Sequence, residues 1–188
     1  PVLTPYWLLS RDAAPTSTSP MATAADPDPT RGGVVVASSR TDPRSFNRLV
    51  HSQIATEMVT MLTQGKLVRV NRETQELEPW LAERWTADPD GRTFTLTLRD
   101  GLLWSDGTPF TSADVLFTFA AVYDPRTASA LSLALSPGGK PLTVTAPDAR
   151  TVVVAFPDVF APGVRLLDNL PMFPKHKLEA ALAAGEIA

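Results

Sequence analysis

The chain has 188 residues, 44% of them hydrophobic and 20% charged, and its formal net charge at pH 7 is −3. A chain of this size can bury a core, and its acidity argues against a nucleic-acid binder, which needs a basic face. Since the sequence has no cysteine, disulfides, thiolate nucleophiles and cysteine zinc sites are excluded. No apolar run approaches the roughly 18 residues of a membrane span.

The N-terminal residues 1–31 are rich in proline, alanine, threonine and serine. Such a composition buries too little apolar surface to offset the entropy lost on ordering. It predicts a disordered leader or linker, and the functional alternative is a spacer between a membrane anchor and a domain. Order is expected from Gly32 onward, where the β-branched run 34–37 predicts a buried strand.

Residues 52–64 have the apolar spacing of a helix, with Ile54, Met58, Met61 and Leu62 on one face. Ser52 is the expected N-cap, and Gly65 the expected stop. The two methionines are interpreted as core filler.

The next segment alternates short strands and turns. Residues 66–70 predict a strand, 71–78 a polar turn, and 79–83 a short helical turn with proline at its first position. The sequence Asp-Pro-Asp-Gly at 88–91 is typical of a tight turn. After it, Phe94, Leu96 and Leu98 alternate with threonines, which predicts an amphipathic strand.

Thr111 and Asp114 are spaced as a capping box, so a helix is expected to follow and to end at Asp124-Pro125. Residues 136–140 should form a loop. Two strands are predicted at 142–144 and 151–156, joined by a turn around Pro147-Asp148, with helices at 164–169 and 177–184. Strands and helices without a regular repeat indicate a mixed α+β fold.

No phosphate loop, nucleophile elbow or zinc-protease helix occurs. The two histidines, His51 and His176, lie far apart, and each is interpreted as a surface or hydrogen-bonded residue rather than a metal ligand. The sequence therefore predicts no metal site and no cofactor.

Two groups of side chains could carry chemistry or binding. Asp100, Asp106 and Asp114 could in principle form an acid–base pair, but aspartate at turns and helix starts already has a structural role. Aromatic residues are clustered, and they are expected to form a small core, with a ligand platform as the alternative; they are Trp80, Trp85, Phe94, Trp104 and Phe110.

Residues 80–85 (WLAERW) and 88–99 (DPDGRTFTLTLR) resemble the signature of the family 5 extracellular solute-binding proteins, the dipeptide-, oligopeptide- and nickel-binding proteins of ABC importers. Residues 103–115 (LWSDGTPFTSADV) are similar to the family's next block, and Asp124-Pro125 follows it. Upstream, residues 41–47 resemble its opening Asp-Pro segment. Downstream, residues 174–176 resemble its Pro-Lys-His segment. The resemblance runs in order from about residue 32 to 178.

The resemblance implies the N-terminal part of a type II periplasmic-binding-protein-like fold, a two-lobed fold with a mixed sheet and flanking helices. Residues 32–188 would be the N-terminal portion of that protein. Within it, about 32–50 and 160–188 would belong to lobe I, and about 51–159 to a small accessory domain. The second lobe would lie wholly beyond residue 188.

By the same resemblance, the chain is a non-enzymatic, extracytoplasmic receptor, periplasmic or on the cell surface and anchored upstream. It would be monomeric, hold a peptide or similar small solute between two closing lobes, and deliver it to an ABC permease. Ser52 and Gln53 are the predicted ligand contacts, although Ser52 could simply cap its helix. The alternatives are a small carboxylate-dependent hydrolase and a stand-alone protein-interaction domain.

Overall fold

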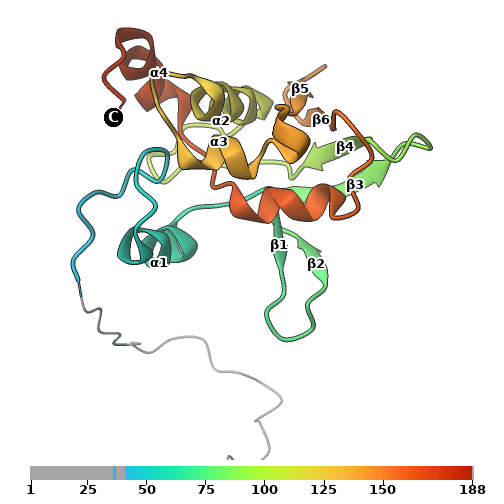
Figure 1. Ribbon diagram of the computed structural model, residues 1–188, viewed down its shortest axis with the longest axis horizontal. Coiled ribbons are helices and arrows are strands. Elements are labelled where there is room, and N and C mark those ends of the chain that lie inside the picture. The colour runs from blue at the N-terminus through green and yellow to red at the C-terminus, as the bar shows by residue number, and fades with distance from the viewer. Residues whose placement is uncertain (1–35, 37–40, 188) are drawn as a thin grey trace, which may run out of the picture. The chain divides into compact units, whose positions relative to one another are not determined.

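The computed structural model describes Val36 and residues 41–187 (Figure 1). The predicted leader and the predicted strand at 34–37, apart from the exposed Val36, lie outside these residues. The helices and strands, with η marking 3-10 helices, are α1 (Ile54–Thr63), β1 (Val68–Val70), β2 (Leu77–Pro79), β3 (Ala82–Ala87), β4 (Thr93–Leu98), α2 (Ser112–Tyr123), α3 (Ala130–Ala134), η2 (Pro137–Gly139), β5 (Thr143–Thr145), β6 (Thr151–Ala155), η3 (Gly163–Asn169) and α4 (Lys175–Ala184).

The main sheet is antiparallel, with strand order β3-β4-β6-β5. The turn between β3 and β4 forms at the predicted Asp-Pro-Asp-Gly sequence. There Gly91 adopts a left-handed φ of 67°, and the Asp90 carboxylate accepts hydrogen bonds from the backbone of Arg92 and Thr93 at 2.8 and 3.0 Å. The predicted amphipathic strand is β4, whose Leu96 and Leu98 are buried. The mixed α+β prediction is confirmed.

The predicted helical turn at residues 79–83 is wrong. Pro79 ends β2, which pairs with β1, and Ala82 begins β3, which pairs with β4. Strand pairing on both sides satisfies more backbone groups than an isolated helical turn could, so tertiary context overrides the local proline signal. The expected polar turn is correspondingly shorter, because β2 already begins at Leu77.

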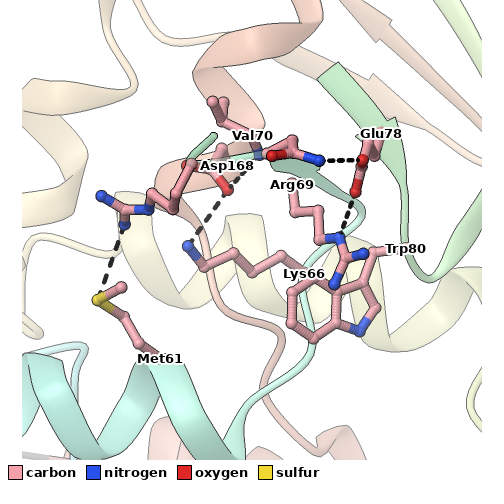
Figure 2. Close-up of a pocket in the computed structure, with 9 residues that line it drawn as sticks. Met61, Lys66, Arg69, Val70, Glu78, Trp80 and Asp168 are labelled. Atoms are coloured by element: carbon pink, nitrogen blue, oxygen red, sulfur yellow. Dashed lines mark hydrogen bonds and ion pairs between the residues drawn. The ribbon is translucent and has the colours of Figure 1, made fainter. Parts of the chain in front are cut away.

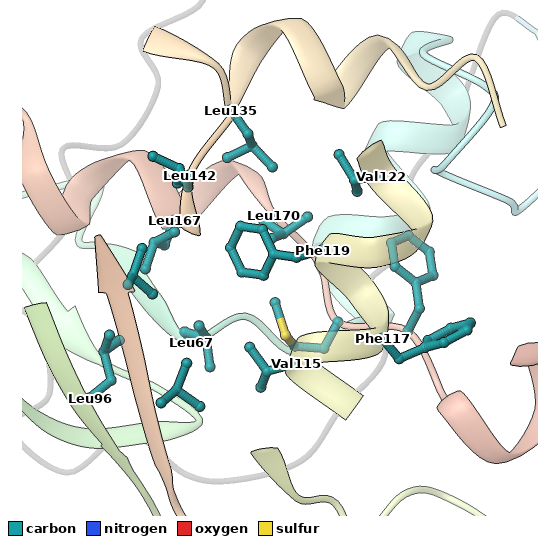
Figure 3. Close-up of a cluster of buried hydrophobic side chains, with 14 of the residues drawn as sticks. Leu67, Leu96, Val115, Phe117, Phe119, Val122, Leu135, Leu142, Leu167 and Leu170 are labelled. Atoms are coloured by element: carbon teal, nitrogen blue, oxygen red, sulfur yellow. The ribbon is translucent and has the colours of Figure 1, made fainter. Parts of the chain in front are cut away.

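Helix α2 begins as the sequence predicts. The Thr111 hydroxyl accepts a hydrogen bond from the backbone of Ala113, and the Asp114 carboxylate accepts one from the backbone of Thr111 at 2.9 Å. The helix ends at Tyr123 with Asp124 as its C-cap, also as predicted. Its apolar face contributes to the core, which Figure 3 shows as side chains gathered from the sheet, the helices and η3; those labelled there are Leu67, Leu96, Val115, Phe117, Phe119, Val122, Leu135, Leu142, Leu167 and Leu170.

The C-terminal part of the chain returns to the segment around residues 47–67. Met172 donates a backbone hydrogen bond to the Gly65 carbonyl at 2.9 Å, and the Asn47 side chain donates to the Ile187 carbonyl at 2.6 Å. The predicted helix at 177–184 is α4, and that at 164–169 is η3. Helix α3 and the 3-10 turn η2 were not predicted, and η2 occupies most of the expected loop at 136–140.

Helix α1 exists where expected, but its orientation was predicted wrongly. Its buried residues are Ala55, Thr56 and Thr60, and the Thr56 hydroxyl donates to the Ser45 carbonyl at 2.8 Å. The apolar stripe that should have been core faces outward instead, with exposed fractions of 40–86%; it consists of Ile54, Met58, Met61 and Leu62. The described chain therefore leaves one apolar helix face uncovered.

Candidate functional site

The predicted contact residues lie at the start of α1. Gln53, not Ser52, is the N-cap of the helix, and neither side chain caps it. Ser52 is exposed, and the Gln53 side-chain oxygen accepts a 3.4 Å hydrogen bond from the backbone of Arg44. The expected capping role of Ser52 is thus wrong, and neither residue lines the cavities described below.

A cavity of about 300 Å³ opens between α1, the β1–β2 hairpin and η3 (Figure 2). We call it the charged cavity because five of its lining residues carry charged side chains. Its lining residues are Met61, Lys66, Arg69, Val70, Asn71, Arg72, Glu78, Trp80 and Asp168. The sequence predicts Met61 as core filler and Trp80 as part of an aromatic core, and no local pattern predicts the other lining residues. Lys66 and Asp168 are 102 positions apart, so no local pattern could have paired them.

One wall of the charged cavity is fixed by Asp168. Its Oδ1 lies 3.4 Å from the Lys66 ammonium nitrogen and accepts a hydrogen bond from the backbone of Val70 at 3.2 Å. Both charged side chains are largely buried, with exposed fractions of 14% for Lys66 and 19% for Asp168. The hydrogen bond from Val70 ties η3 to β1, and the ion pair ties η3 to Lys66, which lies just before that strand.

Another part of the lining is built around Glu78. Its carboxylate accepts hydrogen bonds from Asn71 Nδ2 at 2.7 Å and from Arg69 Nε at 2.8 Å. These donors hold the pKa of Glu78 below its usual value, with Asn71 contributing most. The Arg69 guanidinium lies 5.2 Å from the ring centroid of Trp80, a cation–π contact.

The Trp80 contact revises the prediction that the clustered aromatics form one core. Trp85 and Trp104 do pack against the core, but Trp80 lines the charged cavity. Phe94 and Phe110 follow the prediction: Phe110 is buried, and Phe94 packs against the core.

A second cavity, of about 450 Å³, has a mainly apolar wall that includes Leu81, Leu102 and Trp104. At its edge, the Asp106 carboxylate lies 2.8 Å from His176 Nε2 and 2.8 Å from Lys177 Nζ. These groups, Lys177 first, hold the pKa of Asp106 far below its usual value. His176 is thus a hydrogen-bonded residue, as expected.

The other two candidate carboxylates also have structural partners. Asp114 caps α2 and accepts hydrogen bonds from Trp104 Nε1 at 3.3 Å and from the backbone of Lys175 at 3.0 Å. The exposed Asp100 lies 3.6 Å from Arg150. Within the described residues, no group of three or more histidine or acidic side chains is placed to hold a metal ion. None of the described helices has the length and apolarity to cross a membrane.

Comparison with known proteins decides the family. The sequence profile of the bacterial extracellular solute-binding proteins, family 5 Middle, matches residues 76–186, more than half of the chain. The chain belongs to this family.

Curated relatives of this family 5 chain include the probable ABC transporter-binding protein of Deinococcus radiodurans, 28% identical over 139 residues that make up 74% of the chain and 23% of that protein. The periplasmic murein peptide-binding protein MppA of Escherichia coli is 31% identical over 119 residues, 56% of the chain and 22% of that protein. The family 5 chain therefore spans less than a quarter of the length of these two relatives.

Solved structures agree on the fold. OppA of Haemophilus influenzae, in complex with RPPGFSPFR, matches with a TM-score of 0.67 and 29% identity, covering 74% of this chain and 30% of that one. The ABC transporter substrate-binding protein CtaP of Listeria monocytogenes matches with a TM-score of 0.66 and 29% identity, covering 73% and 28%. The fold of this family 5 chain is thus that of part of a solute-binding protein.

Proposed function

We propose that the chain is the N-terminal portion of an extracytoplasmic solute receptor of an ABC import system, which holds a peptide or similar small solute between two lobes. The observation that carries the proposal is the family match over residues 76–186, together with a relative and a solved structure that are named as binding proteins. The turns and caps within that match specify fold rather than catalysis: Asp90 closes a hairpin, and Thr111 begins α2.

The proposed receptor also implies a division of the chain into two domains. Residues 32–50 and 160–188 belong to lobe I, and 51–159 form a small accessory domain. The hydrogen bond from Asn47 to the Ile187 carbonyl supports this division, because it joins the two segments assigned to lobe I. The exposed apolar stripe of α1 supports a larger protein, since a helix face of this kind is normally covered.

Within the receptor, Ser52 and Gln53 contact the solute at the start of α1. Ser52 is exposed, and the hydrogen bond of Gln53 to Arg44 is long and exposed, so a ligand can replace it at small cost. A solute that touches both lobes stabilises the closed state alone, and closure then follows from differential affinity. The receptor acts as a monomer in the periplasm or at the cell surface, anchored upstream, and delivers its solute to a membrane permease.

No observation on the described residues favours the hydrolase alternative. Asp106 is held by the Lys177 ammonium and the His176 ring, and Asp114 by a helix start, an indole N–H and a backbone N–H. Each carboxylate thus has a structural role, and the names of the relatives are those of binding proteins.

The test is a thermal-shift titration of the natural gene product that carries this sequence, with a panel of di- to pentapeptides. Nickel complexes and oligosaccharides serve as comparison ligands. A peptide present at a hundredfold excess over its Kd should stabilise the protein by about 2.7 kcal/mol.

A Ser52→Ala, Gln53→Ala double variant should keep the melting temperature of the free protein and lose most of the peptide-induced shift. Asp100→Ala, at an exposed site remote from α1 in sequence, is the control and should keep the shift. If no member of the panel shifts the melting temperature, the proposal is contradicted.

A further inference from the structure

The charged cavity carries an uncompensated positive charge. Three cationic side chains line it, those of Lys66, Arg69 and Arg72, against two carboxylates, those of Glu78 and Asp168. Arg69 pairs with Glu78 at 2.8 Å, and Lys66 pairs with Asp168 at 3.4 Å. The cation left over is Arg72.

The Arg72 guanidinium has N–H donors that are available to a ligand. Its side-chain contact is a 4.0 Å approach to the sulfur of Met61, which is a weak acceptor. No carboxylate of the described residues lies within ion-pair distance of its guanidinium. A planar guanidinium in this state is suited to a bidentate bond with a carboxylate.

Lys66 adds a second, better-shielded cation. Its side chain is only 14% exposed, and its one ion pair, at 3.4 Å, is longer than an ideal charged hydrogen bond. Charges withdrawn from water interact more strongly with a ligand than exposed charges do. Lys66 and Arg72 also both line a further small cavity, whose other charged side chains are those of Arg48, Glu57 and Asp168, so the cations still outnumber the carboxylates by one when the two linings are taken together.

The rest of the lining is suited to the apolar part of a ligand. Met61, Val70 and Trp80 border the same cavity (Figure 2). The volume of about 300 Å³ lies at the lower end of the range for small-molecule sites. A ligand that fits therefore combines one negative charge with a ring or a short apolar chain.

We propose that the charged cavity binds a small aromatic monocarboxylate, with its carboxylate on Arg72 and Lys66 and its ring against Trp80 and Met61. The site does not involve Ser52 or Gln53 and needs no second lobe. A test of this site is therefore independent of a test of the proposed function. The same carboxylate chemistry could come from a free acid or from the C-terminus of a peptide that ends in an aromatic residue.

The experiment is an NMR titration of the 188-residue chain with indole-3-acetate at low salt. We expect shifts of the amides near Lys66 and Trp80, with a Kd on the order of 1 mM, as befits a small ligand. Raising the salt to about 0.5 M should weaken binding. Indole-3-acetamide, which keeps the ring without the charge, and acetate, which keeps the charge without the ring, should each bind at least tenfold more weakly. A Gly-Trp dipeptide distinguishes the peptide source from the free acid.

Arg72→Gln should raise the Kd for indole-3-acetate at least tenfold, and Arg72→Lys should restore part of the affinity because it keeps the charge. Arg92→Gln is the matched control, since Arg92 is an exposed arginine on the β3–β4 turn, and it should bind like the parent chain. Equal binding of the acid and its amide, unchanged affinity in Arg72→Gln, or no amide shifts at 10-fold the expected Kd would each overturn the proposal.

Discussion

Asp114 shows how much one residue can organise in this fold. Its carboxylate accepts hydrogen bonds from the backbone of Thr111, the indole of Trp104 and the backbone of Lys175. It thereby joins the start of α2, the loop before it and the start of α4. The capping role was predictable because Thr111 and Asp114 are three positions apart. The bond to Lys175 was not, because it spans 61 positions.

Asp114→Ala should therefore destabilise the chain strongly. Loss of the cap costs about 1 kcal/mol, and the stranded N–H groups of Trp104 and Lys175 add to it, giving about 2–4 kcal/mol in total. Urea unfolding followed by circular dichroism measures the loss. Asp100→Ala, at a site 87% exposed, should stay within about 0.5 kcal/mol of the parent. Equal stability of the two variants would contradict this account of Asp114.

Asp106 should make the chain sensitive to acid. Lys177, His176 and the backbone of Thr108 lower the pKa of its carboxyl in the folded state. The unfolded value is about 4, so the carboxylate contributes stability above that pH, and the contribution is lost as pH falls toward the folded pKa. The stability difference between the parent and Asp106→Asn should then be largest near neutral pH and shrink below about pH 4. Urea unfolding at pH 7, 5, 4 and 3 tests this, and a difference independent of pH would contradict it.

At the level of elements, the spacing of apolar residues and the turn-forming residues located most strands and helices. Tertiary packing decided the structure of the β2–β3 segment and the buried face of α1. The β3–β4 turn and the start of α2 follow from local rules, since Asp90 and Thr111 satisfy nearby backbone groups. The β2–β3 segment does not, because β2 pairs with β1 before it and β3 pairs with β4 after it. In α1 the 3.6-residue period located the helix, but the period alone cannot say which face the core covers.

The outward stripe of α1 has a direct consequence for stability. Ile54 and Leu62 are 78% and 86% exposed, so the double variant Ile54→Gln, Leu62→Gln should change the unfolding free energy by no more than about 1 kcal/mol. Leu67→Ala, at a fully buried core residue, should cost about 2–5 kcal/mol. Chemical denaturation of both variants separates the cases. A large loss in the glutamine variant would mean that the stripe is covered in the isolated chain.

On the scale of the whole molecule, family and fold class were accessible from sequence because ordered motifs between residues 80 and 125 specify turns and caps. The charged cavity was not accessible, because Lys66, Glu78 and Asp168 come together through tertiary packing. The chain spans less than a quarter of its first curated relatives. We infer that the solute site is completed by residues outside this chain, with the start of α1 as this chain's contribution.

Hydrogen–deuterium exchange of the natural gene product, with and without a saturating peptide, tests that inference most directly. If the start of α1 contacts the solute, the amides of residues 50–55 become protected when peptide binds, while the β3–β4 turn around Asp90 exchanges as before. Peptide binding that leaves residues 50–55 unchanged, or that protects the β3–β4 turn instead, would contradict it.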